Sequence, residues 1–281
     1  MESHELTPLQ SRLLEMLKWF DGFCRANGLD YYLLGGTMLG AARHQGFIPW
    51  DDDIDVGLFR NDYERFINLM KGKQECGKYI VEAPDSENKD FCYPYAKVYD
   101  VSTTLIEHYA VPLKRGIFLD IFPIDYLGNS HEECQKKYAA IKNLYNFYLT
   151  RVAASDGHRS WYKNAAIKVS RCIPFINNRK LRMRLDQKCA NVNDRLTWGG
   201  NLLGNWGIKE IMPISVMGKP KEYIFEGHKV YGVADYDSYL TNLYGNWREL
   251  PPKDKQVTHH DYLELDLDKP FRQDKYNTSI I

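Results

Sequence analysis

The sequence has no excess of either charge, no long apolar run and no internal repeat. Lysine and arginine together number 37, as do aspartate and glutamate, so the chain has no global attraction for nucleic acid. No stretch approaches the roughly 18 consecutive apolar residues that indicate a transmembrane helix. The sequence also contains no low-complexity segment.

The cysteines are few and widely spaced. All six stand singly, with no Cys-x-x-Cys pair and no Cys–His cluster at zinc spacing. We therefore expect reduced, buried thiols, as is usual in the cytoplasm. The first ten residues, MESHELTPLQ, are charged and helical in character, unlike a signal peptide. These features predict a cytoplasmic protein, and peripheral docking on the cytoplasmic face of a membrane stays open.

The size and composition fit an ordinary globular protein. With 281 residues, of which 44% are hydrophobic, the chain suits one large domain or two small ones. Strand and helix patterns do not alternate as regular βαβ units, which predicts an α+β or mixed α/β fold. We expect a catalytic core over residues 1–127, a helical insertion over 128–200 and a C-terminal part over 201–281 that completes the site. One continuous domain over residues 1–281 is the alternative.

Capping signals and periodicity predict the individual elements. Thr7 and Gln10 form a capping box for a helix with Pro8 in its first turn, and Gly28 ends that helix. Ser130 opens a long helix that lasts to about residue 153. The remaining expected helices cover residues 38–44, 61–71, 159–196 with a break at Pro174, and about 235–244. The expected strands cover residues 30–34, 53–59, 78–82, 93–99, 103–107 and 116–122, with a hairpin over 222–233 that turns at Glu226 and Gly227.

The most informative segment is residues 33–56, LLGGTMLGAARHQGFIPWDDDIDV. A Gly-Gly-Thr turn follows an apolar strand, and a short helix and a loop then lead to four aspartates. Asp53 and Asp55 alternate with aliphatic residues, so a strand would point both carboxylates to one face. Carboxylates side by side in a dry cleft repel each other unless a hard cation lies between them, and Mg²⁺ prefers oxygen ligands. The segment predicts a metal site for nucleoside-phosphate chemistry; a solvated acidic loop is the alternative.

A second motif, residues 115–125, reads RGIFLDIFPID. Asp120 interrupts a strongly apolar strand, where a carboxylate is costly to bury without a partner. It is therefore either a salt-bridge or capping residue, or a third acid that completes the metal site or accepts a proton from the acceptor hydroxyl. Asp125 is expected in a loop or as a cap, and a role in the site is its alternative.

Several basic residues are further candidates for phosphate binding. Arg43 and His44 end the short helix just before the acids, where arginine can bind phosphate bidentately or both can compensate the helix dipole. Lys97 lies on a middle strand, either facing a phosphate or on a solvated face. His259 and His260 could bind phosphate or serve as general base, and a surface loop is the alternative.

A basic stretch covers residues 161–184, which contain seven lysines or arginines and no acid. Aromatic and aliphatic residues are interleaved with these charges. A basic, aromatic and amphipathic helix can lie on an anionic lipid surface, here the inner membrane. The alternative is a helix pair with a solvated basic face.

These motifs resemble those of the LicD family of phosphotransferases. Residues 35–56 are close to the signature of that family, and residues 115–125 are similar to its second motif. Residues 244–260, YGNWRELPPKDKQVTHH, resemble its C-terminal motif. The resemblance spans most of the chain, although the middle, about residues 128–200, carries no motif that matches. The zinc-binding cysteine cluster of the fukutin-type relatives is missing.

The resemblance implies a nucleotidyltransferase-like α/β core with a mixed β-sheet flanked by helices, plus a helical insertion. In such enzymes a glycine turn holds the nucleotide phosphates, two acids on the next strand bind Mg²⁺ or Mn²⁺, and a third acid comes from a neighbouring strand. The matching positions are Gly35, Gly36 and Thr37 for phosphate, then Asp53, Asp55 and Asp120 for catalysis and metal, with Asp51 as a further metal ligand.

The implied reaction is transfer of phosphocholine from CDP-choline to a sugar hydroxyl of a bacterial cell-surface glycan, with release of CMP. Teichoic acid, lipopolysaccharide and capsule precursors, which can be lipid-linked, are the expected acceptors. Aromatic residues would surround the trimethylammonium group, and the sequence does not show which ones. Three alternatives stay open: transfer of ribitol or glycerol phosphate from the CDP-alcohol, nucleotidyl transfer with release of pyrophosphate, and a non-catalytic glycan- or nucleotide-binding protein.

Overall fold

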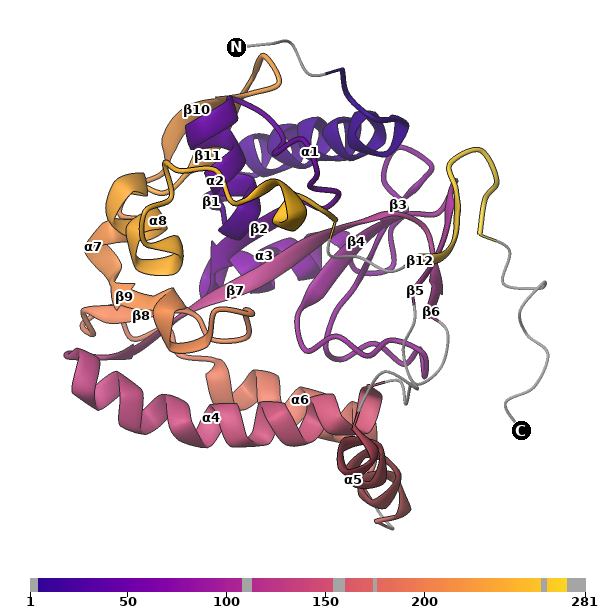
Figure 1. Cartoon of the computed structure of the whole chain (residues 1–281), viewed down its shortest axis with the longest axis vertical. Helices are drawn as coiled ribbons and strands as arrows, with labels where there is room; N and C mark the ends of the chain where they lie inside the picture. Colours follow the sequence, from indigo (N-terminus) through magenta and orange to yellow (C-terminus); the bar gives the residue numbers. More distant parts are fainter. Residues whose placement is uncertain (1–4, 108–112, 154–159, 174–175, 259–261, 272–281) are drawn as a thin grey trace.

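The computed structural model describes residues 5–107, 113–153, 160–173, 176–258 and 262–271. Long helices lie around a central sheet whose longest strand, β7, crosses the middle of the molecule (Figure 1). The helices are α1 (Pro8–Ala26), α2 (Gly35–His44), α3 (Arg60–Met70), α4 (His131–Val152), α5 (Trp161–Cys172), α6 (Asn178–Cys189), α7 (Ile214–Met217) and α8 (Tyr236–Tyr244), with short 3₁₀ turns η1 (Gly207–Glu210) and η2 (Lys253–Lys255).

The strands form two sheets. They are β1 (Tyr31–Leu33), β2 (Asp55–Phe59), β3 (Tyr79–Glu82), β4 (Ala96–Asp100), β5 (Thr104–Glu107), β6 (Leu113–Arg115), β7 (Phe118–Gly128), β8 (Trp198–Asn201), β9 (Ile211–Pro213), β10 (Lys221–Phe225), β11 (His228–Gly232) and β12 (Tyr262–Asp266). Among the described residues, nine strands form a mixed sheet in the order β10-β11-β1-β2-β7-β4-β3, with β8 and β9 continuing beside β7. Strands β12, β5 and β6 form a second, antiparallel sheet. The predicted mixed α/β fold, with a mixed sheet flanked by helices, is confirmed.

Helix α1 begins and ends as its sequence predicts. The side chain of Thr7 accepts a hydrogen bond from the Gln10 amide at 3.1 Å, and the Gln10 side chain accepts one from the Thr7 amide at 3.0 Å. Gly28 follows the helix with a left-handed φ of 59°. The buried Gln10 side chain also donates to the carbonyl of Asp51 at 2.9 Å. Helix α1 therefore supports the loop that carries the acidic run.

The central sheet has one apolar face and one polar row. On β2, Val56 and Leu58 are fully buried in the main core, as are Leu119 and Ile121 on β7. Because side chains alternate across a strand, the residues between them point to the other face. Asp55 and Asp120 lie on that second face, which helix α4 partly covers.

Strand β7 is longer than predicted and continues through Pro123. Proline normally disrupts a central strand because it has no N–H to donate. Here β4 pairs with β7 only as far as Ile121, and β8 begins its pairing at Ile124. Pro123 lies in the gap between these two partners, so the missing donor removes no ladder bond on that side. The expected end of the strand at residue 122 is wrong for this reason.

Strand β2 begins at Asp55 rather than at Asp53, and α2 begins at Gly35 rather than at residue 38. The glycine pair forms the first turn of the helix itself, since glycine tolerates the φ of 49° at Gly35. The hydroxyl of Thr37 accepts a hydrogen bond from the Asp55 amide at 2.9 Å, which fixes the start of the ladder. Asp53 therefore precedes the strand, and the expected strand alternation with Asp55 is wrong in detail.

Asp125 is a structural residue of the core. It is fully buried in β7, where the Nε and Nη2 atoms of Arg60 donate to its two carboxylate oxygens at 2.9 and 2.6 Å. The Nη1 atom of Arg60 donates to Asp186 on α6 at 2.7 Å. This pair of contacts joins the main sheet to the helical segment. The expectation that Asp125 lies in a loop or caps a helix is wrong, because a bidentate arginine compensates its burial.

The helical segment after β7 matches its sequence signals in outline. Ser130 caps α4 by accepting from the Glu133 amide at 3.2 Å. Helices α5 and α6 replace the single region expected over 159–196, whose predicted break at Pro174 lies outside the described residues. A second core lies between α4, α6 and the segment that follows β8. The predicted hairpin is confirmed as β10 and β11, with Glu226 and Gly227 both at positive φ in its turn.

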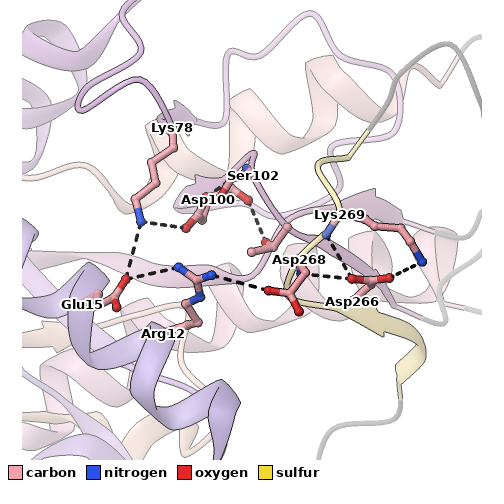
Figure 2. Close-up of polar contacts among 9 residues, drawn as sticks. Arg12, Glu15, Lys78, Asp100, Ser102, Asp266, Asp268 and Lys269 are labelled. Carbon is pink, nitrogen blue, oxygen red and sulfur yellow. Dashed lines mark hydrogen bonds and ion pairs between the residues drawn. The ribbon is translucent and has the colours of Figure 1, made fainter.

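The last described residues return to helix α1 (Figure 2). Arg12 of α1 lies 3.5 Å from Glu15 and 3.8 Å from Asp268, which follows β12. Lys78 contacts Glu15 at 3.6 Å and Asp100 at 3.4 Å. Glu15 and Asp268 are exposed, and Arg12 and Lys78 are half-buried, so each of these pairs is expected to contribute little to stability. The path of β12 over β5 is defined by its own backbone ladder.

All six cysteines are free. Cys24, Cys134 and Cys189 are buried, as predicted. Cys92 is half-buried, and the remaining two, at positions 76 and 172, are exposed. The expectation of buried thiols is therefore correct for only part of the set.

Candidate active site

The centre of the site is a row of charged side chains that crosses three strands. Asp55 on β2 is the register partner of Asp120 on the parallel strand β7, and Lys97 on β4 is the register partner of Asp120 on its other side. Register partners share a face of the sheet. The Nζ atom of Lys97 lies 2.7 Å from Oδ1 of Asp120, an ion pair whose angles fall short of a hydrogen bond.

Burial and mutual repulsion raise the pKa values of these carboxyls. Burial raises the pKa of Asp55 well above its usual range, and the charges of Asp53, Asp120 and Asp51 raise it further. Burial also raises the pKa of Asp120, to about 6, although the charge of Lys97 opposes this shift. Carboxyls that repel one another in a buried setting form a strong attractive site for a cation.

The glycine turn lies directly against the acids. A Cβ atom on Gly35 would lie 3.2 Å from Oδ2 of Asp55, and one on Gly36 would lie 2.8 Å from Oδ2 of Asp51. Side chains at these two positions would therefore displace the carboxylates. The turn and the acids, which are separated by a helix and a loop in sequence, are in contact.

Helix α8 fixes the same turn from the other side. The amide of Gly35 donates to the hydroxyl of Tyr239 at 3.0 Å, and the hydroxyl of Tyr244 would lie 4.0 Å from a Cβ on Gly35. The amides of Gly36 and Thr37 belong to the first turn of α2, where N–H groups have no acceptor within the helix. Since the Gly35 amide already donates to Tyr239, the amides of Gly36 and Thr37 are the candidates for binding an anion.

A pocket opens above this centre, with walls from β1–β2, β4–β7, α4 and the segment between β8 and β9. Its acidic and basic side chains are Asp53, Asp55, Glu107, Asp120, Glu210 and Lys97. Its aromatic side chains are Tyr93, Tyr95, Phe118, Phe122, Tyr145 and Trp206. The pocket thus combines several carboxylates with many ring faces.

The donor set fits a hard divalent cation. Asp53, Asp55 and Asp120 present carboxylate oxygens to one pocket, and such oxygens are the preferred ligands of Mg²⁺ and Mn²⁺. In the part of the chain that the structure describes, no three His, Cys, Asp or Glu side chains already converge on a single metal position. The carboxylates would therefore have to approach one another when they bind an ion.

The other aspartate of the run, Asp52, has a different role. Its carboxylate accepts a hydrogen bond from the hydroxyl of Thr258 at 2.6 Å, and it does not line the pocket. This contact brings the C-terminal motif against the acidic loop. His259 and His260, the next residues of that motif, lie outside the described residues.

Arg43 and His44 support the C-terminal segment. The Nη1 atom of Arg43 donates to the carbonyls of Trp247 at 2.8 Å and of Glu249 at 3.2 Å, and its Nε lies 3.0 Å from Nε2 of His44. Neither residue is among those that line the pocket in the described ranges. The structure therefore brings Lys97, and not Arg43, to the acids.

Sequence reasoning missed the wall between β8 and β9. Glu210 is only 6% exposed, and burial raises its pKa to about 8 although the Trp206 amide and the Asn201 side chain donate to it. A Cβ on Gly204 would lie 1.8 Å from Oε1 of Glu210. The motif NLLGNWGIKE offers only its glycines and tryptophan as a signal, and neither indicates which residue faces the pocket.

A glycine turn at a helix start, facing acids on two neighbouring strands of a mixed sheet, defines a nucleotidyltransferase-type phosphotransferase site. Residues 28–152 match the family model described as "LicD/FKTN/FKRP, nucleotidyltransferase domain". Residues 28–152 therefore form a LicD/FKTN/FKRP nucleotidyltransferase domain, and the chain is an enzyme of the LicD type.

Two relatives show how far the similarity extends. The chain is 28% identical over 270 residues to the "Lipopolysaccharide cholinephosphotransferase LicD" of Haemophilus influenzae, covering 92% of this chain and 97% of that protein. It is 46% identical over 50 residues to the human "Ribitol 5-phosphate transferase FKRP", covering 18% of this chain and 10% of that protein. The first similarity extends over nearly the whole chain, including the helices that follow β7.

Proposed function

We propose that this enzyme transfers phosphocholine from CDP-choline to a sugar hydroxyl of a bacterial cell-surface glycan and releases CMP. The observation that supports this most strongly is that one pocket contains the first turn of α2 together with Asp53, Asp55 and Asp120. The similarity to a lipopolysaccharide cholinephosphotransferase over nearly the full length supports the choice of cargo and favours a lipopolysaccharide precursor among the acceptors.

In this proposal the amides of Gly36 and Thr37 bind phosphate oxygens of the donor, as helix N-termini do for anions. Asp53 and Asp55 hold Mg²⁺, or Mn²⁺ in its place, with Asp51 and Asp120 as further ligands. The bound ion supplies charge neutralisation for the diphosphate as CMP leaves. Lys97 adds a positive charge beside Asp120, on the side of that residue away from Asp55.

The proposed chemical step is a single displacement. The acceptor oxygen forms a bond to the phosphorus that carries choline, and the bond from that phosphorus to the oxygen of CMP breaks. Asp120 either ligates the metal or accepts the hydroxyl proton, for which a carboxylate beside the reacting oxygen suffices. Both assignments agree with its position beside Asp55.

We also propose that helix α5 contacts the membrane that carries the acceptor. None of the helices in the described residues is long and apolar enough to cross a bilayer. Helix α5, however, exposes Trp161 by 81% and Val169 by 65%, beside the exposed Lys163 and Lys168. Such a combination favours an anionic lipid interface.

The basic stretch as a whole is not one such surface. Arg182 is buried and donates to the carbonyls of Pro84, Phe91 and Ser86. Arg179 of the same helix also donates to backbone carbonyls. Of residues 161–184, the proposal therefore concerns α5 alone, because α6 uses these arginines for internal packing.

The test is product analysis with a panel of donors in the presence of Mg²⁺. CDP-choline, CDP-ribitol, CDP-glycerol and CTP are each incubated with the enzyme and a glycan acceptor, and CMP and pyrophosphate are both quantified. We expect CMP from CDP-choline. CMP from CDP-ribitol or CDP-glycerol alone would show that the transferred group is ribitol or glycerol phosphate. Pyrophosphate from CTP would show that the reaction is nucleotidyl transfer.

A further inference from the structure

The wall formed by residues 201–210 has no role in the displacement proposed above, yet it faces the same pocket. Glu210 and Trp206 of this wall line the same pocket as Gly35 and the acids. The charge of Glu210 is close enough to contribute to the raised pKa of Asp55, behind burial and the nearer aspartates. Because Glu210 and the acids line one pocket, a group that is attached to the reacting phosphate by a short linker would lie in the same cavity as Glu210.

The carboxyl of Glu210 is held in place by its own loop. The amide of Trp206 donates to Oε1 at 3.1 Å, and only a glycine at position 204 leaves room for the carboxyl. Among the described residues, no lysine, arginine or histidine forms an ion pair with Glu210. A buried carboxylate is costly without such a partner, so the site is suited to a cationic ligand.

Two aromatic residues, Trp206 and Tyr145, line the pocket together with this carboxyl. The amide of Trp206 donates a hydrogen bond to the carboxyl of Glu210. The Trp206 ring packs edge-on against that of Tyr244, with ring centroids 4.7 Å apart. Burial raises the pKa of Tyr145 on α4, and the charges of Tyr138 and Glu210 raise it further, which places Tyr145 near the same carboxyl. Both rings line the pocket.

The opposite wall already binds a cation through ring faces. The ammonium of Lys97 lies 3.3 Å from the ring centre of Phe118 and 3.8 Å from that of Tyr93. The two walls differ in how their carboxylates are paired. Lys97 forms an ion pair with Asp120. Lys209 of the Glu210 wall instead donates to the carbonyl of Leu243 and lies 5.6 Å from the ring centre of Trp206.

We propose that Glu210, Trp206 and Tyr145 form the subsite that binds the trimethylammonium group of the donor. This inference deepens the proposed function and rests on it. A quaternary ammonium has no N–H to donate, so ring faces and one carboxylate satisfy it, whereas a polyol requires hydrogen bonds for every hydroxyl. Burial raises the pKa of Glu210 to about 8, and a neighbouring quaternary ammonium would favour its ionised form.

The test compares the binding of four ligands by titration calorimetry, with Mg²⁺ present and without a glycan acceptor. The ligands are CDP-choline, CDP-glycerol, CDP and the CDP ester of 3,3-dimethylbutanol, which has the shape of choline without its charge. The wild type is expected to bind CDP-choline about tenfold or more tightly than the neutral isostere, since a desolvated cation–π or charged contact contributes on that order.

Glu210→Gln should lose this preference by weakening CDP-choline about tenfold, with little change for the isostere and for CDP. Trp206→Leu should weaken both choline-shaped ligands, and because Trp206 is 41% exposed this variant should fold even if Glu210→Gln does not. Trp161→Leu on α5 removes an exposed tryptophan away from the pocket and should bind all four ligands as the wild type does.

Two outcomes separate this inference from the proposed function. In the first outcome, the wild type prefers CDP-choline to the neutral isostere, and both variants either keep that preference or lose as much affinity for CDP as for CDP-choline. The subsite is then overturned while the donor assignment stands. If the wild type binds CDP-glycerol as tightly as CDP-choline, the choline donor itself is overturned, and the subsite with it.

Discussion

Asp55 and Asp120 are register partners on adjacent parallel strands, and Lys97 pairs with Asp120 from the antiparallel strand on its other side. The two acids come from motifs that are far apart in sequence, and sheet topology alone makes them neighbours. The ion pair with Lys97 opposes the rise that burial causes in the pKa of Asp120, whereas the charged neighbours of Asp55 are carboxylates. This asymmetry suits a site in which one carboxylate binds metal and the other is held in position.

Lys97→Met should destabilise the fold and reduce CMP release. The methionine leaves Asp120 buried without its cation, and breaking such a pair costs about 3–5 kcal/mol. The double variant Lys97→Met with Asp120→Asn should recover much of the free energy of unfolding but none of the activity. Urea unfolding of the four proteins gives the coupling energy, and a value near zero contradicts the pairing.

Asp125→Ala should be among the most destabilising changes outside the site. It leaves the buried guanidinium of Arg60 without its bidentate partner, at a cost of about 3–5 kcal/mol. Glu132→Ala removes an exposed partner of Lys136 and should cost less than about 1 kcal/mol. Urea unfolding measures the free energy of unfolding of both variants. Equal decreases would show that the contacts of Arg60 do not stabilise the packing of the two cores against each other.

The pH dependence of stability should reveal Glu210. Burial raises its pKa from 4.5 to about 8, so between these values the folded state retains a proton that the unfolded state releases. Its contribution to stability is complete below about pH 4.5 and is lost as the pH rises through about 8. Glu210→Gln lacks this titration, so its stability relative to the wild type should increase from pH 5 to pH 8, by on the order of a few kcal/mol in total.

Urea unfolding at four pH values measures this difference. Glu64→Gln, at an exposed position on α3, is the matched control and should show the same pH profile as the wild type. A difference between Glu210→Gln and the wild type that does not change with pH contradicts the buried ionisable state of Glu210.

The membrane contact of α5 predicts a charge-dependent affinity for vesicles. Replacing Lys163 and Lys168 with glutamine should weaken co-sedimentation with phosphatidylglycerol vesicles about tenfold or more, since each basic residue near an anionic surface contributes about 1 kcal/mol. The same change at Lys221 and Lys229, on the hairpin at the opposite end of the molecule from α5, is the control (Figure 1). If both double variants bind the vesicles equally well, the proposed contact between α5 and the membrane is contradicted.

Local sequence was sufficient for the parts of the fold that depend on neighbours in the chain. The capping box at Thr7, the cap at Ser130 and the hairpin turn at Glu226 each involve residues within a few positions of one another. The glycine turn and the acids were recognisable for the same reason, because a short helix and a loop join them. Their contact at Gly36 and Asp51 follows from that connection.

Contacts between distant segments were not predictable in this way. Asp125 was misassigned because its partner, Arg60, lies 65 positions away, and nothing near Asp125 indicates a buried arginine. Glu210 was missed because its position depends on Gly204 and on the path of β8 beside β7. Lys97 could be assigned to either face until its register with Asp120 was known.

The central claim is that the carboxylates on β2 and β7 perform phosphocholine transfer through a bound divalent metal ion. The most direct test is CMP release from CDP-choline by the wild type, Asp55→Asn and Asp52→Asn, each with Mg²⁺ and with EDTA. Asp52 is the matched control, since it belongs to the same acidic run but binds Thr258 outside the pocket. We predict that EDTA stops the wild type, that Mg²⁺ or Mn²⁺ restores it, and that only Asp55→Asn lowers turnover, by on the order of a thousandfold or more. Activity that survives EDTA, or an Asp55→Asn enzyme as active as Asp52→Asn, would contradict the account.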